Sequence, residues 1–192
     1  MDVRLEEIRS AVKTMLKEDE GRFTHTLGVA STAKRLARQY GLDSKKAEIA
    51  GLCHDICKCM LQEKMHRWAS KGFDEAIIRV YSPDAMHALA GRMYCEKKLG
   101  IDDTDILDAI QYHVYGRPFM SMLEKIIFVS DYIEPSRTFV SDEIKILAFE
   151  NLDEAVYASS RGIINHLKRT GKPVNHLGLK TLNAFRPSKR RN

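Results

Sequence analysis

The sequence lacks any hydrophobic run long enough to cross a membrane, because no apolar stretch approaches the roughly 18 residues that a spanning helix needs. It is also poor in cysteine, with 4 in 192 residues. The C-x3-C-x-C spacing of the first three differs from the C-x2-C spacing of zinc knuckles. We expect reduced, half-buried thiols and no disulfide framework in a cytosolic chain of this length. The four thiols are Cys53, Cys57, Cys59 and Cys95.

Acidic residues are missing from the C-terminal segment. From Arg161 to Asn192 there are nine Lys and Arg and no Asp or Glu, so the other 160 residues hold 22 basic and 26 acidic side chains. The net charge of +5 therefore comes from this segment, which ends in Lys189, Arg190 and Arg191. Basic tails can bind nucleic acid or anionic ligands, but more often they are solvated ends. We expect no nucleic-acid partner and no membrane partner, and a homodimer is left open.

The N-terminus lacks the features of a signal peptide. Its first sixteen residues, MDVRLEEIRSAVKTML, carry acidic side chains and have no apolar segment followed by a small-residue cleavage site. We therefore expect a cytoplasmic protein. Its composition, 44% hydrophobic and 30% charged, is that of an ordinary globular domain.

Alternating strand patterns are absent beyond a few residues, and no internal repeat is found. Almost every segment instead repeats its apolar residues with a period near 3.6, which predicts a single all-α domain over residues 1–192. Residues Asp142–Arg169 are predicted as one long helix or as two that join near residues 159–162. The other predicted helices are Val3–Lys17, Phe23–Tyr40, Lys45–Cys57, Leu61–Ala69, Asp74–Val80, Asp84–Leu99, Asp102–His113, Phe119–Ile133 and Asn175–Phe185.

Six ionisable residues lie in these apolar helical patterns. They are His25, His54, Asp55, His87, His113 and Asp131. His113 follows Ile110 at i+3, for example, and Asp131 follows Phe128 at i+3, so both point toward the core. A single inward histidine usually serves packing. Six such groups are harder to explain that way, because each buried charge needs a partner, and together they indicate a bound cation.

The spacing of the six residues indicates a site built from several helices. The gaps are 29 residues from His25 to His54, then 32 from Asp55 to His87, 26 to His113 and 18 to Asp131. These gaps are too long for a local zinc loop and place the ligands on five successive helices of a bundle. Mixed imidazole and carboxylate sites suit iron, manganese or zinc. The other histidines, His66, His166 and His176, fall outside the pattern and are predicted to be surface or structural residues.

His25, His54-Asp55 and Asp131 match the signature of the HD-domain metal-dependent phosphohydrolases, which this chain resembles. The similarity is closer still to the YqeK-like branch, whose members are symmetrical bis(5'-nucleosyl)-tetraphosphatases. It rests on the segments around His87 and from Ala109 to Pro118, and on RFTHTLGVASTAKRLARQYGLD, AGLCHDICK and MLEKIIFVSDYIEPSR. The matching segments cover about residues 20–140, with a weaker match beyond.

The resemblance implies an HD-domain helical bundle with a metal-binding core over about residues 20–140. Residues 141–192 would form a C-terminal helical extension and the basic tail. It also implies two metal ions, with iron expected before manganese or zinc. Carried over residue by residue, one ion would take His25, His54, Asp55 and Asp131, and the other would take Asp55, His87 and His113, with Asp55 bridging. The implied reaction cleaves diadenosine tetraphosphate into two ADP through a hydroxide held between the metals.

A polyphosphate substrate needs further positive groups close to the metals. Lys58 and Arg137 are the leading candidates, and with Asp55 they are assigned to catalysis. Arg22 and Arg117 flank two of the predicted ligands and join Lys58 and Arg137 as predicted substrate-binding residues. Tyr112, Tyr115 and Tyr132 are candidates for stacking on an adenine, although helical tyrosines near a core usually serve packing.

Two alternatives to this function remain open from the sequence. The first is another HD-type nucleotide phosphohydrolase, either a nucleotidase or a phosphodiesterase. The second is a non-catalytic nucleotide sensor or an RNA-binding module that keeps the bundle and uses the basic tail. The presence of all six predicted ligands argues against a site that has lost its chemistry.

Overall fold

The computed structural model describes residues 3–188 as a purely helical chain. Over that range there are eleven α-helices, one short 3-10 helix and no strand, which confirms the all-α prediction. Within the same range, no helix is both long and apolar enough to span a bilayer. The tail residues Lys189, Arg190 and Arg191 lie outside the described residues.

The helices differ widely in length, from one turn to more than five. In chain order they are α1 (Val3–Met15), α2 (Glu20–Gln39), α3 (Ser44–Cys53), α4 (Gln62–Ala69), α5 (Glu75–Ile78), η1 (Pro83–Ala85), α6 (Met86–Leu99), α7 (Thr104–Tyr112), α8 (Met122–Ile133), α9 (Asp142–Glu150), α10 (Leu152–Arg169) and α11 (His176–Ala184).

Short polar side chains fix where several of these helices begin. Asp19 accepts a hydrogen bond from Arg22 N at 2.7 Å at the start of α2. Ser121 and Glu124 form a reciprocal capping box at the start of α8. Such caps satisfy backbone N–H groups that have no partner within the helix, and each contributes about 1 kcal/mol.

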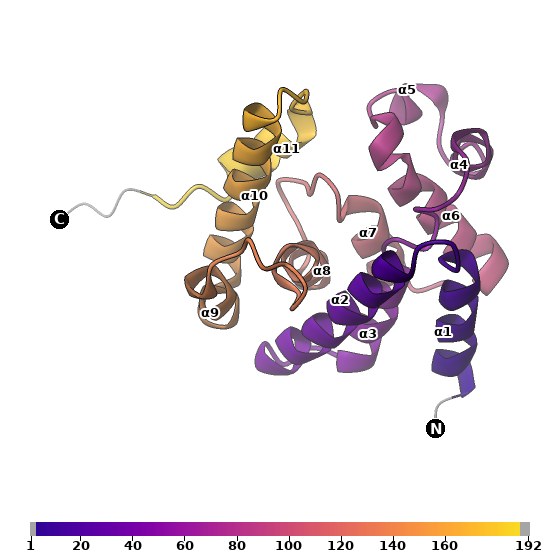
Figure 1. Cartoon of the computed structure of the whole chain (residues 1–192), viewed down its shortest axis with the longest axis horizontal. Coiled ribbons are helices and arrows are strands. Elements are labelled where there is room, and N and C mark those ends of the chain that lie inside the picture. Colours follow the sequence, from indigo (N-terminus) through magenta and orange to yellow (C-terminus); the bar gives the residue numbers. More distant parts are fainter. Residues whose placement is uncertain (1–2, 189–192) are drawn as a thin grey trace.

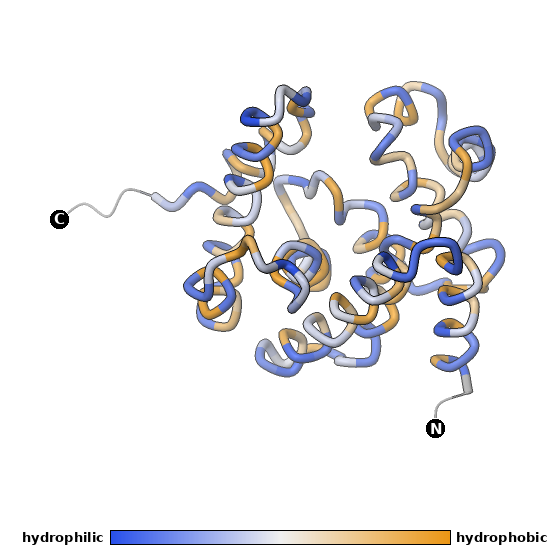
Figure 2. The backbone as a smooth tube through the Cα atoms, in the orientation of Figure 1, coloured by the Kyte–Doolittle hydropathy of each residue, from blue (hydrophilic) through white to orange (hydrophobic). Residues whose placement is uncertain are grey.

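The centre of the molecule is formed by α2, α3, α6, α7 and α8. α2 packs along α3, and α8 contacts both of them and α7 (Figure 1). α9, α10 and α11 lie together beside α8, at the side of the molecule opposite α1. Hydrophobic and hydrophilic segments alternate along the helices (Figure 2), and the core contains fully buried Leu36, Leu52, Ile56, Ile110 and Ile127.

α2 and α3 approach each other closely at Gly51. A Cβ atom at this position would lie 2.7 Å from Ala30 Cα and 3.0 Å from Ala30 N, so any larger residue would collide with the backbone of α2. Glycine at position 51 therefore sets the separation of these two helices. Both helices lead into the predicted ligand set, because α2 contains His25 and α3 ends directly before His54.

Most predicted helix boundaries differ from the structure by three residues or fewer, but two are wrong by more. The helix predicted over Lys45–Cys57 ends at Cys53, and the next residues form tighter turns, with Ile56 N donating to Cys53 O at 3.1 Å. The segment Asp142–Arg169 does form two helices, but the break is at Asn151 rather than near residues 159–162. Asn151 has an extended backbone, and its side chain caps α10 by accepting from Glu154 N.

The cysteines are free thiols, but they are more deeply buried than the half-buried thiols that were predicted. All four are free, three of them are buried, and Cys59 is half-buried. Burial raises the pKa of the Cys57 thiol well above its ordinary value. The Cys57 thiol therefore stays protonated and behaves as a small apolar core residue.

Candidate metal centre

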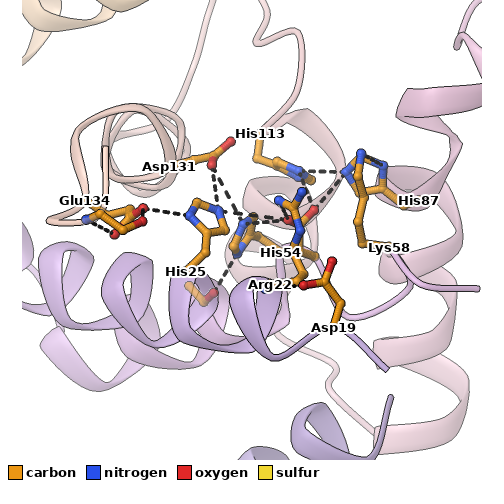
Figure 3. A network of polar contacts seen from close by, with 12 residues as sticks. Asp19, Arg22, His25, His54, Lys58, His87, His113, Asp131 and Glu134 are labelled. Atoms are coloured by element: carbon orange, nitrogen blue, oxygen red, sulfur yellow. Dashed lines mark hydrogen bonds and ion pairs between the residues drawn. The ribbon is translucent and has the colours of Figure 1, made fainter. Parts of the chain in front are cut away.

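The six predicted ligands meet in one place, where the ends of several helices converge. His25 lies within α2, and Asp131 lies in the last turn of α8. His54 and His113 occupy the C-cap positions of α3 and α7, and His87 is the second residue of α6. Figure 3 shows the four imidazoles and the Asp131 carboxylate pointing toward one another from these separate elements. Three overlapping groups of three residues have ligand atoms within 4.8 Å of one another.

Asp55 lies at the centre of the cluster and uses its two oxygens on opposite sides. Oδ2 lies 3.4 Å from His54 Nε2 and 4.0 Å from His25 Nε2. Oδ1 lies 3.0 Å from His87 Nε2 and 3.7 Å from His113 Nε2. Each oxygen thus serves a different pair of imidazoles, which is the arrangement of a carboxylate that bridges two positions.

The turn after α3 explains how two adjacent residues both reach this cluster. In a regular helix, neighbouring side chains are about 100° apart. Here α3 ends at Cys53, and both His54 and Asp55 are buried, at 0% and 3% exposed. The tighter turns after Cys53 therefore bring both side chains inward.

Three of the imidazoles are oriented by their own backbone. The Nδ1 atoms of His54, His87 and His113 each lie 2.7 Å from the carbonyl oxygen three residues earlier. A carbonyl can only accept a hydrogen bond, so each Nδ1 carries the proton and donates it. Each Nε2 is then left with its lone pair directed at the cluster, the form in which imidazole binds a metal.

The fourth imidazole, His25, is oriented by a carboxylate instead. His25 Nδ1 donates to Glu134 Oε1 at 2.9 Å, and Glu134 is only 1% exposed. Glu134 Oε2 accepts from Ser136 N at 2.8 Å, which fixes the carboxylate on the turn after α8. Gly28 makes room for it, because a Cβ there would lie 2.5 Å from Glu134 Oε2. Glu134 was not among the predicted site residues, although it stands in the YIEPSR segment three residues after Asp131.

The resulting set of lone pairs fits a cation. His87 Nε2 and His113 Nε2 face each other at 3.1 Å, and neither has a proton to offer the other. Over the described residues 3–188, the buried Nε2 atoms of His25 and His54 have no hydrogen-bond partner. Buried polar atoms are rarely left without partners. Bound cations would satisfy these nitrogen atoms and remove the repulsion between the facing lone pairs.

The carboxylates of the cluster are kept ionised. Burial alone would raise the pKa of Asp55, but the His54, His113 and His87 rings around the carboxylate hold its pKa well below the ordinary value. Burial opposes ionisation of Asp131 in the same way, but the adjacent His25 ring, with Nε2 3.0 Å from Asp131 Oδ1, outweighs it and lowers the pKa of Asp131. Burial lowers the pKa of His87, which favours the neutral ring that a metal ion requires. The two carboxylates therefore stay ionised near neutral pH, and the His87 ring stays neutral.

Three of the four predicted phosphate-binding residues lie at the cluster. Arg22 Nη1 is 2.8 Å from Asp55 Oδ2, and Arg137 Nη2 is 3.3 Å from Asp131 Oδ1. Lys58 Nζ donates to Asp84 O at 2.9 Å, the same carbonyl that anchors His87. Figure 3 shows Lys58 beside His87 at one end of the cluster, with Asp131 and Glu134 at the other. Positive side chains therefore flank the ligands on both sides.

Arg117 has different partners from those expected of a phosphate-binding residue. Its guanidinium donates to Glu124 at 2.6 and 2.7 Å and to Asp108 at 3.0 Å. It also lies over the Tyr112 ring, with Cζ 4.1 Å from the ring centroid. Glu124 is 1% exposed, so Arg117 neutralises a buried carboxylate and ties the start of α8 to α7.

The tyrosines predicted as candidates for adenine stacking, and the histidines outside the ligand pattern, lie in packing or surface positions. Tyr115 donates to Ser82 Oγ at 3.0 Å, and Tyr132 contacts the Phe139 ring edge-to-face. The three histidines outside the ligand pattern, His66, His166 and His176, are exposed, as predicted.

Comparisons with known proteins agree with this site. The family model of the HD domain matches residues 22–136, a range that contains all six predicted ligands. A protein of Bacillus subtilis named bis(5'-nucleosyl)-tetraphosphatase, symmetrical, is 41% identical over 170 residues, 88% of this chain and 90% of that protein. A protein of the same name from Halalkalibacterium halodurans is 38% identical over 165 residues, covering 85% and 88% of the two chains.

A solved structure supports the fold as well. The crystal structure of a protein from Clostridium acetobutylicum, called a predicted HD superfamily hydrolase involved in NAD metabolism, superimposes with a TM-score of 0.86. The two chains are 39% identical, and the match covers 94% of this chain and 95% of the other. The resemblance seen in the sequence, and the helical bundle expected from it, are thereby confirmed.

Proposed function

Because this chain belongs to the HD-domain family, we propose that it is a metal-dependent hydrolase that cleaves diadenosine tetraphosphate symmetrically into two ADP. The main support for metal-dependent chemistry is the position of Asp55, whose two oxygens each face a different pair of imidazoles. The Nε2 lone pairs of these imidazoles point into the cluster. The choice of substrate is supported by the names of the relatives, which match most of this chain.

We assign two cations to the centre, sharing Asp55. One ion would be held on the Oδ2 side by His25, His54 and Asp131, and the other on the Oδ1 side by His87 and His113. Imidazole and carboxylate donors of this kind suit iron, and also manganese or zinc. Bound divalent cations would lower the pKa of a water from about 15.7 toward about 7 and would neutralise phosphoryl oxygens. The count of two is supported by the three overlapping ligand groups.

The other residues of the site would bind and orient the polyphosphate. Arg22, Lys58 and Arg137 place positive charge around the ligands, where phosphoryl oxygens need neutralisation. Hydrolysis breaks the P–O bond between the second and third phosphates. One ADP keeps the bridging oxygen and the other gains the oxygen of water. The charge that develops on the departing ADP is stabilised by the same side chains.

Product analysis tests this proposal directly. The protein is purified without oxygen, its metal content is measured by elemental analysis, and its products from diadenosine tetraphosphate are separated by anion-exchange chromatography. We expect bound metal and ADP as the sole nucleotide product. AMP together with ATP would refute symmetrical cleavage. Protein that holds no metal and gains no activity with iron or manganese would support the sensor alternative instead.

A pair of variants ties the activity to the centre. His54→Ala removes a ligand that is 0% exposed and should abolish both metal content and turnover. His66→Ala is the matched control, because this side chain is 49% exposed and contacts Glu75 and Ser70 at the surface. It should leave both quantities near those of the unmodified protein.

A further inference from the structure

An aromatic side chain is exposed on the turn that follows α8. Phe139 is 68% exposed and lies between α8 and α9, in a segment that has no regular helix. A single exposed aromatic residue is common on protein surfaces and means little by itself. Phe119, for example, is 92% exposed. What distinguishes Phe139 is the set of residues around it.

The turn connects Phe139 to the metal ligands through Arg137. The Arg137 guanidinium lies 5.9 Å from the centroid of the Phe139 ring, and its Nη2 lies 3.3 Å from Asp131 Oδ1. Arg137 N also donates to Glu134 O at 2.9 Å, so the turn is built on the residue that orients His25. Moving outward from the cluster, the order is therefore the Asp131 carboxylate, the Arg137 guanidinium and the Phe139 ring.

The ring is supported from one side. Tyr132 contacts it edge-to-face, with centroids 5.9 Å apart and an interplanar angle of 75°. Tyr132 in turn lies close against α10, because a Cβ at Gly162 would be 2.0 Å from the Tyr132 hydroxyl. Tyr132 is thus held between Phe139 and a helix backbone. With 68% of Phe139 exposed, most of its ring surface remains open to a stacked ligand.

From this order we infer that Phe139 forms a base-stacking subsite for one adenine of the substrate. The inference rests on the proposed function, since it names where one half of that substrate binds. A nucleotide runs from phosphate through ribose to base, and the structure presents a metal ligand, a guanidinium and an aromatic ring in the same order. Arg137 would hold the phosphate nearest the nucleoside, and Phe139 would stack on the base.

Stacking also predicts what this subsite does not do. Every nucleobase has a flat π face, so stacking on an aromatic ring discriminates weakly between bases. Among the described residues, the Phe139 ring contacts Tyr132 and the Arg137 guanidinium. We assign the first to support of the ring and the second to phosphate binding, so neither is assigned to hydrogen bonding with a base edge. We therefore expect guanine nucleotides to use the subsite about as well as adenine nucleotides.

The test compares a ligand that has a base with one that lacks it. Binding of ADP and of inorganic pyrophosphate to the metal-loaded protein is measured by calorimetry. Phe139→Ala should weaken ADP binding by roughly 5- to 150-fold, the range of base–aromatic stacking, and leave pyrophosphate binding unchanged. Phe139→Trp, which keeps an aromatic face, should retain ADP binding. Phe119→Ala is the matched control and should change neither ligand.

The outcomes separate this inference from the function it rests on. An equal loss of both ligands in Phe139→Ala, or no loss of ADP binding, would overturn the subsite. Unchanged pyrophosphate binding also shows that the variant is folded and loaded with metal. If the unmodified protein makes no ADP from diadenosine tetraphosphate while Phe139→Ala still loses ADP binding selectively, the proposed substrate is wrong and the base subsite stands.

Discussion

Gly51→Ala should damage the metal centre without touching a ligand. The added Cβ would lie 2.7 Å from Ala30 Cα, whereas ordinary van der Waals contact begins at 3.4 Å, so α2 and α3 would have to separate by about 0.7 Å. The colliding atoms belong to the backbone of α2, which cannot rotate away. α2 contains His25, and α3 leads into His54 and Asp55. The substitution therefore changes the distance between residues that we assign to one shared ion.

The expected magnitude follows from two effects of opposite sign. Overpacking a core costs about 1–3 kcal/mol, and a backbone collision belongs at the upper end of that range. Alanine gains back about 1 kcal/mol because it favours the helix over glycine. The net loss should be about 2 kcal/mol of the free energy of unfolding. Metal sites keep their ligand distances within about 0.2 Å, so a shift of about 0.7 Å should also lower metal affinity strongly.

Urea unfolding of the metal-free protein and elemental analysis of the purified protein measure the two effects. Gly178→Ala is the matched control, because Gly178 lies in α11 and a Cβ there meets nothing within 4 Å. That variant should keep its metal and be as stable as the unmodified protein or slightly more so. If Gly51→Ala matches the control in stability and metal content, the close approach of α2 and α3 does not set the ligand geometry.

Three further substitutions test the surroundings of the centre. Glu134→Gln removes the charge that orients His25 and should lower metal affinity by about 10- to 100-fold, measured by competition with a chelator. Asp103→Ala removes the cap of α7 and should cost about 1 kcal/mol at pH 7. Burial would raise the pKa of Asp103, but hydrogen bonds from a lysine and from backbone amides lower it. The contribution of the carboxylate is therefore complete above the unfolded pKa of about 3.9 and is lost as the pH falls through the folded pKa, so urea unfolding should show the deficit shrinking below about pH 3.9. Arg117→Met leaves Glu124 buried without its charge partner and should cost about 3–5 kcal/mol, with the KM for substrate unchanged in the protein that remains folded.

Each of these substitutions has a result that contradicts its reasoning. Unchanged chelator competition in Glu134→Gln would show that its charge does not support His25. A deficit in Asp103→Ala that persists at pH 2 would assign the effect to lost packing rather than to the carboxylate. A raised KM with unchanged stability in Arg117→Met would show that Arg117 binds the substrate, as its position in the sequence predicted.

The sequence was sufficient to predict the bundle and the convergence of the six ligands. The reason is periodicity, since an ionisable residue on an apolar helix face points to the core wherever that helix ends up. The same periodicity predicted the all-α fold, which the structure confirms. Short polar side chains cap several of the helix starts. Spacing along the chain placed His87 and Asp131 on separate helices before any contact was known.

What the sequence could not show depends on local geometry that periodicity does not encode. The break at Asn151 arises from a side-chain cap inside a continuous apolar pattern. Gly162, placed at the predicted join, instead lets α10 approach Tyr132. The partners of Arg117 were missed because a charge beside a ligand in the chain need not face that ligand in space. Glu134 was missed because its role lies in a contact with a residue 109 positions earlier.

The way the imidazoles are anchored decides how the centre can fail by mutation. Three anchors are carbonyl oxygens of the main chain, at Gly51, Asp84 and Ile110, and every amino acid supplies such an oxygen. No replacement at these positions deletes the acceptor. Only His25 is anchored by a side chain, the carboxylate of Glu134, which a substitution can remove. In a random mutant library screened for metal loss with all six predicted ligands intact, codon 134 should stand out above codons 84 and 110. Codon 51 should also appear, but for a different reason, because a side chain at Gly51 collides with the backbone of α2 and leaves the carbonyl in place.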